Sequence, residues 1–369
     1  MRGNRDGKPL RVRAADRLYP APRTPHPARE RSDLRRWLAG VALAGALLAG
    51  GVNLARWRGQ APAREAFRAG LAAAEAGRPQ EAEARWREAV RLAPEYLPPY
   101  RLLAGLYVST GLWRKAYDIL GRLRAVAPGE AHLECQTAEA ALALGLLPEA
   151  EAHARAEVAR DPACGRGRHA LGRLMIRRKN EREAVTHLTE AVRRIPEAVE
   201  PRLDLAQAYI ENMRLPEAQS LLAPLVAEKP ELGHAHYMLG FCYARNAAEP
   251  DGPRKAEAAL RRALAIDATD EGALCELGRL YLLQGRAGAA LPLLRAAARR
   301  APRYPPAFYQ LARALRDVGR PDEARRAEAR YLALNRLAAE QSTLVQRHGI
   351  LPADPAVRRR LAELDAALK

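Results

Sequence analysis

The sequence contains few aromatic residues and little lysine. Of 369 residues, 5% are aromatic, and only six of the 61 basic side chains are lysines. Runs of β-branched residues, which favour strands, are nearly absent. Ala and Leu, which have high helix propensity, dominate an apolar fraction of 48%. The composition therefore predicts an all-α protein with a substantial buried core.

Motifs of catalytic and metal sites are missing as well. The sequence has no glycine-rich phosphate loop, no GxSxG and no HExxH. The pair His234 and His236 has i,i+2 spacing, which on a helix directs the two side chains to different sides. We therefore expect no enzymatic activity, no small-molecule substrate, no cofactor and no metal site.

The formal net charge of +18 is unevenly distributed. Residues 1–36 carry eleven basic and four acidic side chains, and the excess of arginine over lysine is typical of GC-rich coding. A nucleic-acid partner would require exposure to the cytoplasm and a binding affinity that falls steeply with salt. We expect no nucleic-acid binding.

Two segments precede the main body of the chain. Residues 1–36 contain five prolines and no apolar periodicity, so we expect a disordered basic tail. Residues 37–55 begin with sixteen uncharged residues, WLAGVALAGALLAGGV, and Trp37 and Trp57 flank them. A helix needs about 20 residues to cross the hydrocarbon core, and aromatic rings favour its interfaces. We interpret residues 37–55 as a single transmembrane helix.

Two other interpretations of residues 37–55 remain open. A cleaved signal peptide would have an unusually long leader and no well-placed A-x-A site, and a buried helix of a soluble protein is the other alternative. If the segment is a membrane anchor, the basic tail favours a cytoplasmic N-terminus, although four arginines follow the segment closely. Because the composition is bacterial in style, we expect the inner membrane, with the rest of the chain in the periplasm.

A period of 34 residues dominates the remaining sequence. Prolines recur at this spacing, and the series continues after a four-residue insertion around 247–253: Pro94, Pro128, Pro162, Pro196, Pro230 and Pro302. In this register, position 8 is always Gly or Ala: Gly70, Ala104, Ala138, Gly172, Ala206, Gly240, Gly278 and Ala312. Position 20 is always Ala: Ala82, Ala116, Ala150, Ala184, Ala218, Ala256, Ala290 and Ala324.

The recurrence of small residues at two repeat positions has a packing explanation. Two helices approach to about 8–10 Å only where small residues face each other, as at positions 8 and 20. Larger side chains, such as Trp86 or Leu188 at position 24, fill the remaining space. Glycines stand at the predicted turn between the two helices, where a helix end often needs a positive φ: Gly77, Gly111, Gly145, Gly285 and Gly319.

This pattern resembles the tetratricopeptide repeat family over residues 63–335, in eight copies. The resemblance implies a right-handed superhelical solenoid of helix-turn-helix units, whose concave groove is lined by the first helices and binds peptides or partner helices. Residues 336–369 are expected to form C-terminal capping helices. Repeat three departs from the pattern, with Thr137, Ala154 and Glu157 at core positions, and repeat eight departs at Glu328 and Tyr331.

The repeat also places the four cysteines. Cys135, Cys164, Cys242 and Cys275 form no CxxC motif, and the closest pairs are offset by about five residues on adjacent helices. With a rise of 1.5 Å per residue and about 10 Å between helices, their Cα atoms would lie roughly 12 Å apart, which exceeds the disulfide reach of about 7 Å. We therefore expect four free thiols.

The resemblance also indicates which residues face the groove. They combine arginines with aromatic rings and include Arg166, His169, Arg173, Arg177, Tyr237, Phe241, Arg245, Arg279, Tyr309, Arg313 and Arg316. Such a surface suits an acidic or C-terminal segment, since arginine binds carboxylates in bidentate fashion. A solvated arginine face is the alternative. The pattern does not reproduce the two-carboxylate clamp of chaperone-binding relatives.

These features predict a membrane-anchored scaffold that binds partner proteins or peptides in the groove of its repeat array. The alternative is a recruiting or regulatory subunit for a separately encoded envelope enzyme complex.

Overall fold

The computed structural model describes residues 60–249, 251–348, 359–360 and 363. All regular elements among them are α-helical, which confirms the prediction of an all-α protein. Eight helices precede Val199: α3 (Ala61–Glu75), α4 (Pro79–Leu92), α5 (Pro98–Ser109), α6 (Trp113–Val126), α7 (Leu133–Ala143), α8 (Leu147–Arg160), α9 (Gly165–Arg177) and α10 (Glu181–Arg194). Eight more follow: α11 (Val199–Glu211), α12 (Leu215–Glu228), α13 (Gly233–Arg245), α14 (Gly252–Ile266), α15 (Glu271–Leu283), α16 (Ala287–Arg300), α17 (Pro305–Asp317) and α18 (Pro321–His348).

The predicted basic tail (1–36) and hydrophobic segment (37–55) lie outside the described residues. Within the described ranges, none of the helices combines the length and apolar character that crossing a membrane requires. At the other end, α18 is continuous through residue 335, where the eighth repeat was expected to end, and reaches His348.

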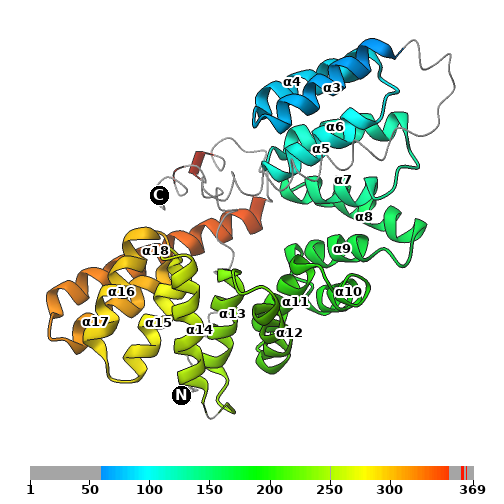
Figure 1. The fold of residues 1–369 in the computed structure, drawn as a ribbon. Coiled ribbons are helices and arrows are strands. Elements are labelled where there is room, and N and C mark those ends of the chain that lie inside the picture. The colour runs from blue at the N-terminus through cyan, green and yellow to red at the C-terminus, as the bar shows by residue number, and fades with distance from the viewer. Residues whose placement is uncertain (1–59, 250, 349–358, 361–362, 364–369) are drawn as a thin grey trace. The chain divides into compact units, whose positions relative to one another are not determined.

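The described chain divides into two compact units, one ending at Pro201 and the other beginning at Arg202. In the first unit, α3 pairs with α4, α5 with α6, α7 with α8 and α9 with α10 (Figure 1). In the second unit, the pairs are α13 with α14, α15 with α16 and α17 with α18. First helices of successive pairs also touch each other, α7 with α9, α13 with α15 and α15 with α17. The first helices α7 and α9 are therefore neighbours in the first unit, and α13, α15 and α17 follow one another in the second.

Small residues at the predicted positions bring the paired helices together. A Cβ atom added to Gly70 would lie 2.4 Å from Nε1 of Trp86, and one added to Gly278 would lie 2.6 Å from the side chain of Leu294. Real Cβ atoms do not approach other atoms so closely. The position-20 alanines are all buried, none more than 2% exposed: Ala82, Ala116, Ala150, Ala184, Ala218, Ala256, Ala290 and Ala324. The packing role predicted for positions 8, 20 and 24 is confirmed at these contacts.

The turns inside the helix pairs share one backbone conformation. The five turn glycines all have positive φ, between 70° and 75°. Lys179 and Met213 occupy the equivalent position in two other turns and also have a φ of 58°, which L-residues adopt at a cost of about 1–2 kcal/mol. The flanking helices therefore impose this conformation even where the chain has no glycine.

Candidate functional site

The predicted groove residues all lie on first helices of their pairs, divided between the two units. The first unit contributes residues of α9: Arg166, His169, Arg173 and Arg177. The second unit contributes residues of α13, α15 and α17: Tyr237, Phe241, Arg245, Arg279, Tyr309, Arg313 and Arg316. Each unit therefore carries its own candidate surface.

In the second unit, Glu276 of α15 holds two of the predicted arginines. Arg245 donates from Nη1 and Nη2 to the two carboxylate oxygens, at 2.7 and 3.0 Å. Arg279 donates from Nε to Oε2 at 2.8 Å. Glu276 is only 5% exposed. These two guanidinium groups therefore already have a carboxylate partner inside the protein.

Aromatic rings lie around these three charged side chains, the triad of Glu276, Arg245 and Arg279. The guanidinium carbon of Arg245 lies 3.7 Å from the centroid of the Phe241 ring, and the Tyr237 and Phe241 rings meet edge to face at 6.4 Å. Burial by itself would raise the pKa of Glu276, but Arg245 and Arg279 hold this pKa below its usual range. Burial raises the pKa of Tyr237 and of the neighbouring Tyr304. The triad is therefore ionised at neutral pH, and both tyrosines are neutral.

The groove residues of α17 contact the unusual residues of repeat eight. Tyr309 is 43% exposed, and the centroid of its ring lies 5.3 Å from that of Tyr331 on α18. Arg316 pairs with Glu328 of α18 at 3.5 Å, and both side chains are about half exposed. The two departures from the repeat pattern therefore serve contacts with the groove-facing helix.

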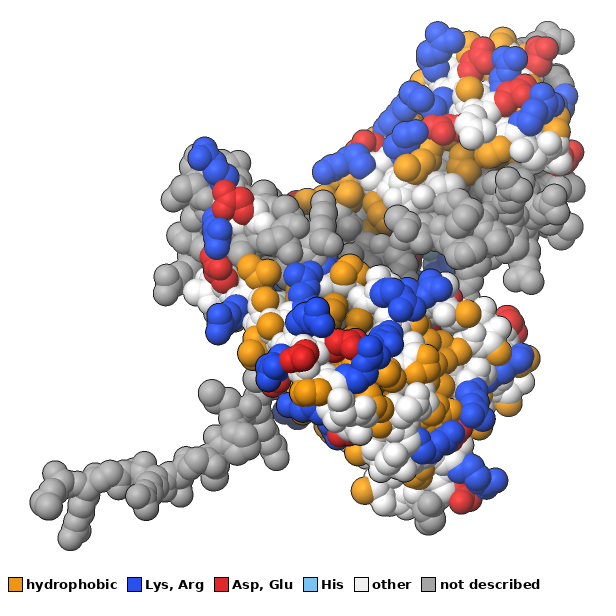
Figure 2. Space-filling model, turned by 90° about the vertical axis from the view of Figure 1, so that its left-hand side faces the viewer, with side chains coloured by type: hydrophobic (Ala, Val, Ile, Leu, Met, Phe, Trp, Pro, Cys, Tyr) orange, Lys and Arg blue, Asp and Glu red, His pale blue; other side chains and the backbone are white. Residues whose placement is uncertain are grey.

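The first-unit surface is basic and less neutralised. Helix α9 contains four arginines and no acidic residue. Arg173 lies 3.7 Å from a carboxylate oxygen of Glu139, whereas Arg166 and Arg177 are exposed and have no ion-pair partner among the described residues. Figure 2 draws described residues of both units and shows Lys and Arg side chains interspersed with hydrophobic ones, with fewer acidic side chains. Exposed guanidinium groups on α9 can bind carboxylates of another molecule.

Two buried carboxylates were not among the predicted site residues. For Glu276, the sequence signal is its i,i+3 spacing to Arg279, which brings the two side chains together on one helix face. For Glu157, the sequence signal is a carboxylate at a core position of repeat three. In the structure its side chain is 1% exposed. The contact of Arg245 with Glu276 had no such sequence signal, because it depends on how α13 packs against α15.

The expected separation of Cys135 and Cys164 is wrong. Their Sγ atoms lie 3.6 Å apart. The reason lies in repeat three, whose first helix α7 has only 11 residues and begins at Leu133, whereas α9 begins at Gly165, 32 residues later instead of 34. Measured from the helix starts, the two cysteines are therefore offset by three positions and not by five. Cys164 also precedes α9 in an extended conformation.

Comparisons with known proteins agree with the helix-pair architecture. The family model for the tetratricopeptide repeat matches residues 73–134 and 175–242. A tetratricopeptide repeat protein from Parabacteroides merdae ATCC 43184 is 15% identical, with a TM-score of 0.50, over 69% of this chain and 99% of that one. The APC/C hetero-tetramer Cut9-Hcn1 contains a chain that is 16% identical, with a TM-score of 0.56, over 77% of this chain and 52% of that one.

A structure of MamA protein is 21% identical over 47% of this chain and 92% of that one, with a TM-score of 0.38. A comparison with curated proteins gave no match. At identities of 15% and 16%, the two structures with TM-scores of 0.50 and 0.56 establish the fold alone. The tetratricopeptide fold is typically that of a non-catalytic scaffold for protein–protein interaction. The family model thus identifies tetratricopeptide repeats in residues 73–134 and 175–242, and the solved structures share the helix-pair fold of the chain.

Proposed function

We propose that this protein is a membrane-anchored scaffold whose first-helix surfaces hold partner proteins, with α9 as the recognition surface for an acidic segment. The observation that supports this proposal is the charge of α9, which has four arginines and no acidic residue. In the second unit, Arg245 and Arg279 are already paired with Glu276. An acidic segment would therefore gain more charge-assisted hydrogen bonds on α9. A separately encoded envelope enzyme is one class of partner that such a scaffold would recruit.

Binding to α9 can be tested with a fluorescent peptide rich in Glu and Leu. We expect the double variant Arg166→Glu, Arg177→Glu of the full-length protein to bind this peptide at least tenfold more weakly. An exposed charge pair contributes up to about 1 kcal/mol, and each reversal also replaces attraction by repulsion, so the two reversals together exceed the approximately 1.4 kcal/mol that corresponds to a factor of ten. Fluorescence anisotropy measures the dissociation constant. Both arginines are exposed, so the fold should not change.

The matched control reverses two exposed arginines on second helices of the same unit, Arg91→Glu and Arg182→Glu. It changes the net charge by the same amount but leaves α9 intact. We expect the control to keep most of the peptide affinity. Equal losses in the two double variants would show that total charge, and not the α9 surface, governs binding.

The proposed anchor is the hydrophobic segment 37–55, with the basic tail in the cytoplasm and the repeat array in the bacterial periplasm. Its support is the sixteen-residue uncharged run preceded by eleven basic residues. We expect a reporter that is active only outside the cytoplasm to give a signal when fused after Lys369. An inactive reporter on a membrane-bound protein would place the array in the cytoplasm, where acidic cytoplasmic proteins would be the partners to seek.

A further inference from the structure

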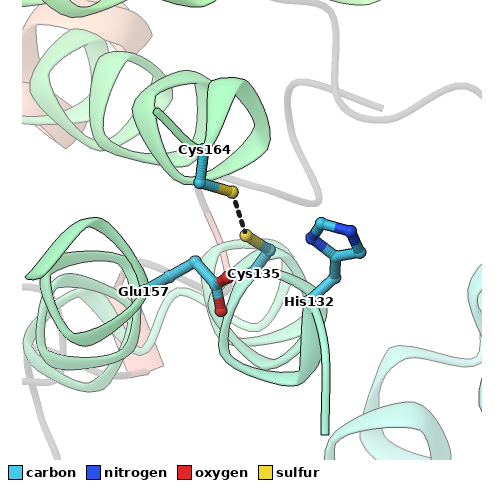
Figure 3. Close-up of side chains that lie close together, drawn as sticks. All are labelled: His132, Cys135, Glu157 and Cys164. Atoms are coloured by element: carbon cyan, nitrogen blue, oxygen red, sulfur yellow. Dashed lines mark hydrogen bonds between the residues drawn. The ribbon is translucent and has the colours of Figure 1, made fainter. Parts of the chain in front are cut away.

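The departures of repeat three bring four chemically reactive side chains together. His132 and Cys135 come from the start of α7, Glu157 from α8 and Cys164 from the residue preceding α9 (Figure 3). One ligand atom from each residue lies within 4.8 Å of the corresponding atoms of the others. Three of the residues are buried, and His132 is exposed at the rim. Three successive helices thus converge on one point with two sulfurs, a carboxylate and an imidazole.

We propose that Cys135, Cys164, Glu157 and His132 form a binding site for a zinc-like divalent metal ion. Zinc is bound tetrahedrally by these donor types, cysteine sulfur, histidine nitrogen and carboxylate oxygen, at about 2.0–2.3 Å. Two sulfurs at about 2.3 Å from a tetrahedral ion are separated by about 3.8 Å. The observed separation of the Cys135 and Cys164 sulfurs is 3.6 Å. The two thiols therefore already have the spacing of a metal-bound pair.

The carboxylate of Glu157 supplies an independent reason for a ligand. Its Oε1 accepts a hydrogen bond from Nη2 of Arg160 at 2.6 Å, but its buried Oε2 accepts none within the described part of the chain. A buried polar atom without a partner costs about 1–3 kcal/mol. Gly167 leaves room for this side chain, because a Cβ there would lie 3.3 Å from Cγ of Glu157. A cation beside the two sulfurs would satisfy Oε2.

The charges of such a site would balance. Two thiolates and the Glu157 carboxylate carry three negative charges, which a divalent ion and the adjacent Arg160 together neutralise. The backbone N–H of Gly167 also donates to Sγ of Cys164 at 3.4 Å, at the N-terminus of α9, where thiolates are stabilised. Zinc binds the thiolate form of cysteine, so metal binding would release the thiol protons of Cys135 and Cys164.

His132 completes the ligand set from the surface. It precedes α7 with a φ of 59°, a conformation in which histidine is enriched among non-glycine residues. Because its side chain is exposed, its ring can rotate toward the buried ligands at little cost. The other two cysteines, Cys242 and Cys275, are buried in the second unit and take part in no comparable cluster among the residues that the structure describes.

The test uses the full-length, reduced protein, loaded with zinc sulfate and separated from excess metal by gel filtration. We expect one zinc ion per chain by mass spectrometry of the metal. Cys135→Ala and Cys164→Ala should lose binding, whereas Glu157→Gln should raise the dissociation constant for zinc at least tenfold, as measured against a chromophoric chelator. Cys242→Ala, which removes a buried thiol elsewhere, should retain the ion.

Cobalt(II) provides a second readout, since a thiolate-to-cobalt charge-transfer band reports cysteine ligation directly. The band should be present in the wild-type protein and the Cys242→Ala control, and absent from the Cys135→Ala and Cys164→Ala variants. The surface variant His132→Asn tolerates the left-handed conformation and should fold normally. We expect it to weaken zinc binding at least tenfold, a loss that misfolding would not explain.

Three results would overturn the proposal. One is that the reduced wild-type protein binds no zinc, while the oxidised protein has two fewer titratable thiols. This combination would identify Cys135 and Cys164 as a disulfide pair. Another is zinc binding that is equally tight in Cys135→Ala and in the wild type, which would place the metal elsewhere. The third is an unchanged zinc affinity in His132→Asn, which would refute the four-ligand site.

Discussion

Replacing Glu276 with glutamine is expected to lower the free energy of unfolding by about 3–5 kcal/mol, the usual effect of removing one member of a buried ion pair. The glutamine cannot neutralise Arg245 and Arg279, whose side chains are 26% and 15% exposed. Both guanidinium groups would then remain largely desolvated without a counter-charge. Such a state is less favourable than either the intact triad or a fully apolar replacement.

Chemical denaturation followed by far-ultraviolet circular dichroism measures this change. The control is Glu217→Gln, because Glu217 pairs with Arg214 on the surface, where the two side chains are 43% and 46% exposed. An exposed pair contributes at most about 1 kcal/mol. Similar losses in the two variants would mean that the triad is not effectively desolvated.

The dependence on pH gives a second check on the triad. Glu276 has a folded-state pKa below the ordinary value of 4.5. Its ionised form therefore stabilises the protein fully above the unfolded-state pKa, and this stabilisation is lost as the pH falls through the folded-state pKa. The difference in stability between the wild type and Glu276→Gln should thus be largest near neutral pH and shrink in acid. A difference that is constant from neutral to acidic pH would exclude the charge as its cause.

Truncating Trp86 to alanine is expected to destabilise the protein by about 3–5 kcal/mol, in the range for large aromatic residues in cores. The Trp86 side chain is fully buried in the first unit and covers Gly70, where no Cβ could fit. Its removal would leave a cavity between α3 and α4, at a position where the backbone of Gly70 offers no side chain to fill it. Thermal and chemical denaturation both report the loss.

Two other variants test this reasoning. Trp113→Ala removes the same ring from a partly buried site on α6 and should cost less. Trp86→Leu should recover part of the loss, because leucine packs over a glycine at the equivalent position of three other pairs, Leu188 over Gly172, Leu260 over Gly240 and Leu294 over Gly278. Equal destabilisation by Trp86→Leu and Trp86→Ala would show that ring shape, and not the filled volume, determines stability there.

The sequence by itself determined the helix pairs. The contact between positions 8 and 24 joins residues only 16 apart in the chain, as with Gly70 and Trp86, so the same small and large residues must recur with every repeat. This locality is why the 34-residue period predicted the packing of each pair. The turns follow from the same local packing. Lys179 and Met213 adopt the positive φ of the turn glycines because the packed helices on either side fix the path of the backbone.

Only the tertiary structure decided which side chains of different pairs meet. The repeat assigned Arg245 and Arg279 to first helices, but Glu276 reaches Arg245 across 31 residues because α13 packs against α15. The same holds for Cys135 and Cys164, whose sulfurs meet because α7 begins two residues late in its repeat. Such encounters depend on shifts of a few ångströms between neighbouring helices, whereas a sequence period records only the average position of each residue type.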